Sequence, residues 1–302
     1  MDEKILTREH AKELIREPDL FHRNIIVPKE ISVIEKDAFS GFQELTSIML
    51  PSVTTIAESA FESCTNLEYV GFGKKLATIG ESAFAGCTKL EQIHLPEGIT
   101  KINAHSFKDC KSLKEVFLPD TLTCIDNYAF ANCSGLEELS LPVGLQFIGK
   151  GAFESCSSLK DNFLISDEIK YIGPSAFADC TAIEHFYLPK QLPEISDFMF
   201  DGCYNLKSVS MPLFVASIGK FAFNDCVNLK QLTLPESLLF IGDYAFKRCI
   251  NLDITINGQA VIYGKSVFKG CCNPTITVPK LSKRLLDALE EDCTTPIIQC
   301  NP

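Results

Sequence analysis

The sequence predicts a repeat solenoid, a right-handed coil whose short strands stack into a single curved parallel sheet with tight turns completing each coil. Three observations predict it. A phenylalanine recurs through eleven units at spacings of 22 to 24 residues, an isoleucine stands five positions before it in ten units, and a cysteine stands three positions after it in ten. Eleven copies in one register, about 23 residues each, indicate one elongated body rather than separate globular domains. The recurring phenylalanines are Phe39, Phe61, Phe84, Phe107, Phe130, Phe153, Phe177, Phe200, Phe223, Phe246 and Phe268.

Residues 90–96 show how each coil forms its strand. Ile93 and Leu95 alternate with polar neighbours, which predicts a strand with one buried face, and Pro96 marks the end of that strand. Ile99 and Ile102 then bring the chain back along the opposite side of the coil.

The segment around each phenylalanine predicts a turn. Ala83, Phe84, Cys87 and Leu90 are one or three residues apart, a spacing that suits a short helical or 3₁₀ turn with one inward face. One coil has too little core to fold alone, so neighbouring coils must stack equivalent side chains on one another. Because burying each large apolar side chain contributes about 1.5–3 kcal/mol, eleven stacked coils give an ample core.

The motif Leu-x-x-Ile-x-Leu-Pro followed by Ile-Gly-x-x-Ala-Phe-x-x-Cys resembles the BspA-like (Treponema-type) class of bacterial leucine-rich repeats. Residues 79–87, Ile-Gly-Glu-Ser-Ala-Phe-Ala-Gly-Cys, are a near-consensus copy, and the resemblance covers residues 25–280. It implies a leucine-rich-repeat solenoid of the α/β type and a bacterial surface or secreted role such as adhesion. The Asn or Cys that broader leucine-rich repeats place after the strand is replaced here by Gly98 or Thr121. We therefore expect mostly β structure with 3₁₀ turns instead of long convex helices.

Both ends of the chain predict helical caps, which a solenoid needs because a bare terminal coil exposes its core. Residues 7–17 have Thr7 as a helix N-cap and Pro18 as a stop, and residues 281–291 have Ser282 as a cap. We expect an N-terminal helical cap over residues 1–24, the leucine-rich-repeat solenoid over 25–280, and a C-terminal helical cap and tail over 281–302.

The charge balance bears on the partner. With 28 Lys and Arg against 39 Asp and Glu, the formal net charge is −11, which argues against a nucleic-acid partner and suits a basic or neutral one. The first residues contain no apolar segment typical of a secretory signal, and no stretch is long enough for membrane insertion. As the sequence stands, we expect a cytoplasmic protein, and a cell-surface or secreted one if a leader was trimmed.

Catalytic and metal-site patterns are weak. Ten of the fourteen cysteines share one register of the repeat, which predicts a ladder of buried, reduced thiols, although adjacent coils are close enough for disulfides. Cys124, Cys272, Cys293 and Cys300 form no CxxC pair, and no HExxH, GxSxG or P-loop is present. We predict no catalytic residue, no metal and no cofactor, and therefore not an enzyme.

The candidate binding site comes from the strand positions that the repeat leaves variable. These positions point to solvent on the concave side of the sheet, and aromatic and acidic residues concentrate over the middle coils. The alternative is that these side chains only stack on one another for stability. The predicted binding residues are Tyr69, His94, Glu115, Phe117, Glu138, Asp161, Phe163, His185 and Tyr187.

The function predicted from these features is a non-enzymatic, monomeric protein-interaction module that binds a protein or peptide on its concave sheet. The alternatives are an intracellular scaffold and a carbohydrate-binding module, for which Phe117, Phe163 and Tyr187 beside carboxylates would provide stacking platforms. Protein binding predicts a footprint over several coils, sugar binding one or two stacking rings, and an enzyme a deep cleft with perturbed titratable groups.

Overall fold

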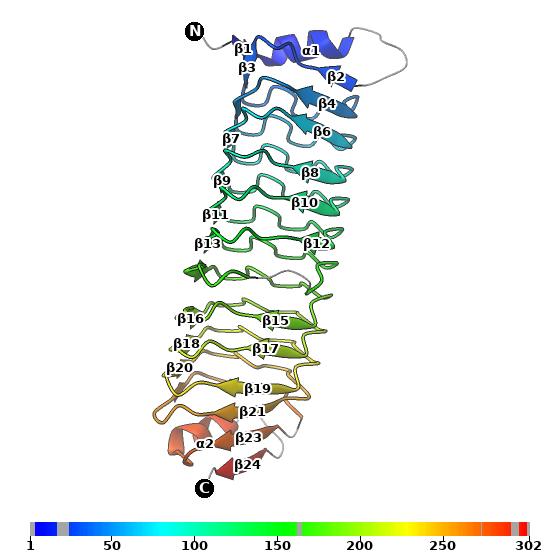
Figure 1. The fold of residues 1–302 in the computed structure, drawn as a ribbon. Helices are drawn as coiled ribbons and strands as arrows, with labels where there is room; N and C mark the ends of the chain where they lie inside the picture. The colour runs from blue at the N-terminus through cyan, green and yellow to red at the C-terminus, as the bar shows by residue number, and fades with distance from the viewer. Residues whose placement is uncertain (1–3, 17–23, 162–164, 273, 291–295, 301–302) are drawn as a thin grey trace.

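A computed structural model describes residues 4–16, 24–161, 165–272, 274–290 and 296–300. The coils stack into one elongated body with the two termini at opposite ends (Figure 1). Every strand pair is parallel, and partners in register are about one repeat apart, as in Val116 with Ile93 and Leu139. The predicted parallel solenoid with a repeat of about 23 residues is confirmed.

Most coils contribute a described strand to each of two ladders. The main ladder runs along one side of the body and contains β2 (Asn24–Ile26), β4 (Ser47–Leu50), β6 (Tyr69–Phe72), β8 (Gln92–His94), β10 (Glu115–Phe117), β12 (Glu138–Leu139), β15 (His185–Tyr187), β17 (Ser208–Ser210), β19 (Gln231–Leu234), β21 (Asp253–Ile256), β23 (Thr275–Val278) and β24 (Ile297–Cys300). The second ladder contains β1 (Lys4–Leu6), β3 (Ile31–Ile34), β5 (Thr55–Ile56), β7 (Thr78–Ile79), β9 (Lys101–Ile102), β11 (Cys124–Ile125), β13 (Phe147–Ile148), β14 (Tyr171–Ile172), β16 (Glu194–Ile195), β18 (Ser217–Ile218), β20 (Phe240–Ile241) and β22 (Ile262–Tyr263).

The expectation of a single sheet was therefore wrong. The return segment of each coil is also extended, because its backbone groups must find partners and the equivalent segment of the next coil offers them. In this segment the isoleucine points inward and the residue before it points outward, as Thr55 and Ile56 pair with Thr78 and Ile79. A strand of two residues is too short to produce a recognisable alternation in the sequence.

At the two breaks in the second ladder, a side chain replaces a backbone N–H as the hydrogen-bond donor. In most coils the residue after the isoleucine donates its backbone N–H to the preceding coil, as Gly149 does to the Ile125 carbonyl at 2.8 Å. Where the ladder breaks between β7 and β9, the Asn103 side-chain amide donates to the Ile79 carbonyl at 2.6 Å instead. At the break between β14 and β16, the Ser196 hydroxyl donates to the Ile172 carbonyl at 2.5 Å.

The turns around the phenylalanines hold consecutive coils together without interruption. Backbone N–H groups at the phenylalanine and at the positions two before and two after it donate to the next coil, at 2.7–3.2 Å, across all ten junctions between the eleven units. In one unit these donors are Ser82, Phe84 and Gly86, whose acceptors are the carbonyls of residues 104, 106 and 108. This turn ladder is the continuous backbone connection along the solenoid, since both strand ladders are interrupted.

The expectation of 3₁₀ turns was also wrong. The positions two before and two after each phenylalanine have φ between 50° and 77° in all eleven units. Such left-handed residues alternate with right-handed ones, so consecutive i→i−3 bonds cannot continue as a 3₁₀ helix. Only every second N–H, such as that of Ala85 to the Ser82 carbonyl, closes a turn within the coil. Ser, Asp, Asn and Gly fill most of these positions, and Gly in particular avoids the steric penalty of this conformation.

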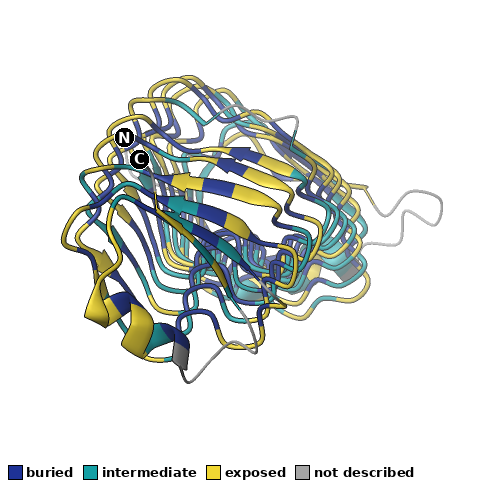
Figure 2. Cartoon of the chain, turned by 90° about the horizontal axis from the view of Figure 1, so that it is seen from below, coloured by how far each residue is buried: buried dark blue, intermediate teal, exposed yellow. Residues whose placement is uncertain are grey.

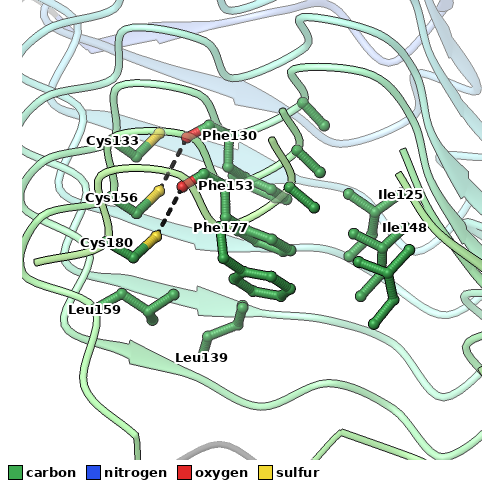
Figure 3. Packing of buried hydrophobic residues seen from close by; sticks show 14 of the residues in the cluster. Ile125, Phe130, Cys133, Leu139, Ile148, Phe153, Cys156, Leu159, Phe177 and Cys180 are labelled. Carbon is green, nitrogen blue, oxygen red and sulfur yellow. Dashed lines mark hydrogen bonds between the residues drawn. The ribbon is translucent and has the colours of Figure 1, made fainter. Parts of the chain in front are cut away.

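The core is a stack of phenylalanine rings along the axis. All eleven anchor rings are fully buried, with neighbouring centroids 5.0–6.2 Å apart and interplanar angles of 2–19°. Figure 3 shows Phe130, Phe153 and Phe177 between the isoleucines on one side and the cysteines on the other. Buried and exposed residues alternate along the strands around this core (Figure 2).

The cysteine column connects the core to the turn ladder. All ten cysteines of the register are buried, and each Sγ donates to the carbonyl of the phenylalanine one coil earlier at 3.0–3.2 Å, as Cys156 does to Phe130 (Figure 3). Burial raises the pKa of the Cys64 and Cys156 thiols to about 12, so they stay protonated and able to donate. The predicted ladder of buried thiols is confirmed, and no described cysteine forms a disulfide.

A helix lies near each end of the body. In α1 (Arg8–Arg16) the Thr7 hydroxyl accepts the His10 N–H at 3.4 Å, and Arg8 donates to the Ser40 carbonyl of the first coil at 3.0 Å. The Arg8 guanidinium also lies 4.9 Å from the Phe42 ring centroid. In α2 (Lys283–Glu290) the Ser282 hydroxyl accepts the Leu285 N–H at 3.2 Å. The division into caps and solenoid at residues 24 and 280 stays a prediction.

Removing one ring from the stack should be far more damaging than removing an exposed one. Phe153→Ala leaves a void between rings whose centroids lie 5.6 and 5.5 Å away, so we expect a loss of about 3–5 kcal/mol. Phe240→Ala, on the second ladder, should change stability by about 0.5 kcal/mol or less. Urea unfolding followed by circular dichroism measures both, and equal losses would contradict the core described here.

Thiol reactivity should separate the buried column from the other cysteines. We expect iodoacetamide at pH 8 to label the exposed Cys272 and Cys300 in the native protein. The ten column thiols should react only in denaturant, because burial blocks access to all of them and raises the pKa of those from Cys64 to Cys249. Peptide mass spectrometry before and after denaturation measures this, and rapid native labelling of Cys156 would show that the column is open to solvent.

Candidate functional site

The main ladder presents alternate side chains to solvent. In β8 the exposed Gln92 and His94 flank the buried Ile93, and β15 repeats the pattern with His185 and Tyr187 around a buried centre. The outward side chains of the main ladder are called the main sheet face below.

At the N-terminal end of this face the outward residues are large and apolar. Ile26, 68% exposed, is in register with Met49, and Met49 is in register with Gly71. A Cβ added to Gly71 would lie 2.3 Å from the Met49 sulfur and 3.3 Å from the Tyr69 ring. The Met49 side chain therefore covers the place that glycine leaves open, and it forms one apolar surface with Tyr69.

Two rings continue this surface on the next strands. His94 on β8 and Phe117 on β10 are register partners, and their rings stack with centroids 4.1 Å apart and planes 13° from parallel. Phe117 is still 48% exposed, so the stack leaves much of its ring available to a partner.

Two carboxylates lie beside the ring pair. Glu115 and Glu138 are register partners on β10 and β12, so two negative charges occupy neighbouring strands. With Phe117 and Ser140 they line an open hollow of about 400 Å³. Because like charges repel each other at this spacing, a cationic group would be attracted to the hollow.

The remaining predicted residues are placed differently. Asp161 accepts the backbone N–H of His185 through Oδ2 at 3.0 Å, so its carboxylate aligns the start of β15. The His185 ring nitrogen Nδ1 is 2.8 Å from the Ser208 hydroxyl. Tyr187 points outward on β15, and Phe163 lies outside the described residues. The structure thus brings His94, Glu115, Phe117 and Glu138 together, with Tyr69 on β6 toward the N-terminus and His185 and Tyr187 beyond the coil that contains residue 163.

Sequence reasoning missed an aromatic surface on the turns. The rings of Phe198, Phe221 and Tyr244 stack 4.8–5.1 Å apart, two residues before their anchors, with φ of 54–57°. The Lys220 ammonium lies 5.6 Å from the Phe198 centroid. These aromatics replace the Ser or Asp found at this position in several other coils, a departure that the sequence shows once the repeat is aligned.

Carboxylates gather on the turns of the sixth to ninth units. Burial raises the pKa of Glu154, Asp179 and Asp201, and facing carboxylates raise each further. Among the described residues, no group of three or more His, Cys, Asp or Glu side chains could hold a metal ion.

Parallel coils of about 23 residues with an inward Leu, Ile, Phe and Cys core define a leucine-rich repeat protein. A family model described as the BspA type leucine rich repeat region matches residues 21–134, 100–215 and 194–293. The chain belongs to this family. Among curated proteins, no sequence matches it.

Solved structures of bacterial repeat proteins are similar to it. A leucine-rich repeat protein from Bacteroides ovatus is 24% identical, with a TM-score of 0.52 and 92% of both chains covered. The pneumococcal vaccine antigen PcpA is 19% identical, with a TM-score of 0.52 and coverage of 92% of this chain and 89% of that one. The leucine-rich repeat protein TpLRR of T. pallidum is 28% identical, with a TM-score of 0.47, and covers 68% of this chain and 83% of its own. The first two likenesses show the fold.

In the part of the chain that the structure describes, neither helix is long and apolar enough to cross a membrane.

Two glutamates whose pKa values are shifted in opposite directions should change the stability in opposite directions when each is replaced by glutamine. Burial raises the pKa of Glu154, so its ionised form destabilises the fold at pH 7, and Glu154→Gln should stabilise it by about 0.5 kcal/mol or less because the site is partly exposed. Lys160 lowers the pKa of Glu137 through a hydrogen bond, so Glu137→Gln should lower the melting temperature slightly.

The Glu154 effect should disappear as the pH falls below the ordinary glutamate pKa of about 4.3, whereas the Glu137 effect should persist to lower pH and disappear only as the pH falls through the lowered pKa of Glu137 in the folded chain. Melting temperatures at pH 7 and at low pH measure them. A lower melting temperature for Glu154→Gln at pH 7 would contradict the assignment of its environment.

Proposed function

We propose that this chain is a non-enzymatic protein-interaction module that binds a protein or peptide on the N-terminal half of its main sheet face. The chain belongs to a family of leucine-rich repeat proteins, and such repeats serve as scaffolds for protein interactions. One observation supports the location: exposed large side chains follow one another from β2 to β10, namely Ile26, Met49, Tyr69, His94 and Phe117.

A contiguous apolar surface of this kind is typical of protein-binding sites. Hot spots in interfaces are dominated by a few large, mostly aromatic side chains that are packed in the complex and surrounded by polar groups. The repeat requires inward residues at alternate strand positions, but it sets no such requirement on these outward ones, so their size is not needed by the core.

Glu115 and Glu138 favour a partner with a basic group near the ring of Phe117. Their carboxylates line the hollow that contains this ring, and the whole chain carries a formal net charge of −11. Long-range attraction of a basic partner would accelerate association, and the paired carboxylates would fix its orientation.

The proposal includes the wider setting predicted from the sequence. The chain acts as a monomer without a cofactor, and membership in the BspA-type family supports a bacterial surface role such as adhesion. Tyr69, His94, Glu115, Phe117 and Glu138 form the main contact area, and Asp161, Phe163, His185 and Tyr187 remain the predicted extension of this site toward the C-terminus.

The test is a capture experiment with matched variants. Wild-type protein, the double variant Tyr69→Ala with Phe117→Ala, and the control Tyr244→Ser would be immobilised and exposed to bacterial surface extract and to host extracellular matrix. Tyr244→Ser removes an aromatic ring from the turns and restores the residue found there in other coils. Truncating two hot spots typically weakens binding at least about thirtyfold.

We expect the same proteins to be captured by the wild type and the control, and to be depleted from the double variant, with all melting temperatures unchanged. Quantitative mass spectrometry of the eluates measures this. Capture by the double variant at the wild-type level would show that the N-terminal half of the main sheet face is not the site.

A further inference from the structure

The C-terminal half of the main sheet face has a different chemistry. From β17 to β23 the outward residues form two rows along the axis of the solenoid. The row nearer the strand ends is Ser210, Thr233, Thr255 and Thr277, and the other is Ser208, Gln231, Asp253 and Thr275. Because the strands are in register, successive groups of a row follow at one strand spacing, about 4.8 Å.

The hydroxyls of the first row are available to a ligand. Elsewhere in the chain, hydroxyl side chains donate to carbonyls of the preceding coil, as Thr121 does to Ile99 at 2.9 Å and Thr181 to Ser157 at 3.2 Å. On the main sheet face, the neighbouring carbonyls belong to the strand ladder. Within the described residues, no hydrogen bond is made by the side chains of Ser210, Thr233, Thr255 and Thr277.

A hollow and a ring adjoin this row. The hollow has a volume of about 610 Å³, a size typical of ligand sites. Polar groups of Ser210, Gln231, Thr233, Glu236 and Asn257 line it beside the apolar Met211, Leu213 and Pro235. Tyr187, 64% exposed, is the register partner of Ser210 and stands at the N-terminal end of the row.

The charge and size of the outward side chains from β17 to β23 distinguish between an anionic polymer, a protein and a neutral glycan as the ligand. The outward residues of β17, β19, β21 and β23 include one carboxylate, Asp253, and no Lys or Arg, and Glu236 adds a second carboxylate at the hollow, so nothing here attracts a polyanion. They also include no large apolar side chain, which a protein partner would need as an anchor. A chain of neutral hydroxyl groups fits, because hydroxyls and side-chain amides both donate and accept hydrogen bonds.

We propose that a linear neutral polysaccharide binds along this part of the main sheet face, with Tyr187 stacking on one sugar ring and the row from Ser210 to Thr277 hydrogen-bonding to the following sugars. The hydroxyl groups of such a glycan repeat along its chain, and the hydroxyl groups of Ser210, Thr233, Thr255 and Thr277 repeat along the axis of the solenoid in the same way. The site does not rest on the proposed protein-binding function, whose main contact area lies on the strands from β2 to β12 and whose predicted extension shares only Tyr187 with it.

Calorimetric titration of the intact chain tests the proposal. The probes are linear hexasaccharides of β-1,4-linked glucose, mannose and xylose, with a galacturonic acid hexamer as the anionic comparison. We expect at least one neutral hexamer to bind in a one-to-one complex, and the anionic hexamer to bind more weakly or not at all.

Two threonine pairs supply a matched comparison. Thr233→Val with Thr255→Val removes two hydroxyls from register partners on β19 and β21 and keeps the branched shape. Each lost hydrogen bond should weaken binding about two- to twelvefold, so the pair should weaken it about four- to 140-fold. Thr55→Val with Thr78→Val, register partners on the second ladder, should leave the affinity unchanged. Tyr187→Ala should weaken binding, and Phe117→Ala should not.

Four results would overturn the proposal: no binding of any neutral hexamer, equal affinity in the Thr233/Thr255 variant, equal loss in both threonine variants, or tighter binding of the anionic hexamer. Failure of the protein-binding proposal would appear separately, in the capture experiment with the Tyr69 and Phe117 variant.

Discussion

The structure depends on the hydrogen bonds that the turn around each phenylalanine makes to the next coil. Three backbone N–H groups per coil donate across every junction between the units, whereas the main and second strand ladders are both interrupted. The same turn places the ring in the buried stack and lets its carbonyl accept the thiol of the next coil, as Phe130 accepts from Cys156 at 3.2 Å. Backbone pairing, ring stacking and thiol donation therefore impose one spacing on the coils. This explains why the phenylalanine and cysteine positions hardly vary while the strand positions between them do.

A spacing set by the turns leaves the main sheet face available for binding. Its outward side chains contribute little to the core, so their chemistry can change from coil to coil without altering the backbone path. The result is a face with two halves: Ile26, Met49, Tyr69 and Phe117 give the N-terminal half a contiguous apolar surface, and small hydroxyl side chains replace them from β17 onward. The backbone tolerates substitutions on its turns as well, since Phe198, Phe221 and Tyr244 adopt the left-handed conformation that serine or glycine adopts elsewhere.

The sequence predicted the repeat, the parallel stacking and the buried phenylalanine and cysteine columns, because each repeats in one register and a buried column permits little variation. It did not predict the second ladder, since strands of two residues give no alternation, or the left-handed turn positions, whose Ser, Asp and Gly residues are also common in other turns. At the site, the outward placement of Tyr69, His94, Phe117 and Tyr187 followed from the period of two. The packing of Met49 over Gly71 and the use of Asp161 to hold His185 could not be predicted, because both depend on side-chain geometry between coils.

Amide hydrogen exchange at the junction between the Phe84 and Phe107 coils tests the central claim most directly, because both strand ladders are interrupted near it, between β6 and β8 and between β7 and β9. If the turns carry the solenoid, the amides of Ser82, Phe84 and Gly86 should exchange as slowly as those of Tyr128, Phe130 and Asn132, all of which donate to the next coil at 2.7–3.0 Å. Fast exchange at Ser82, Phe84 and Gly86, with slow exchange confined to the strands, would show that the strand ladders hold the coils together and that the turns only follow.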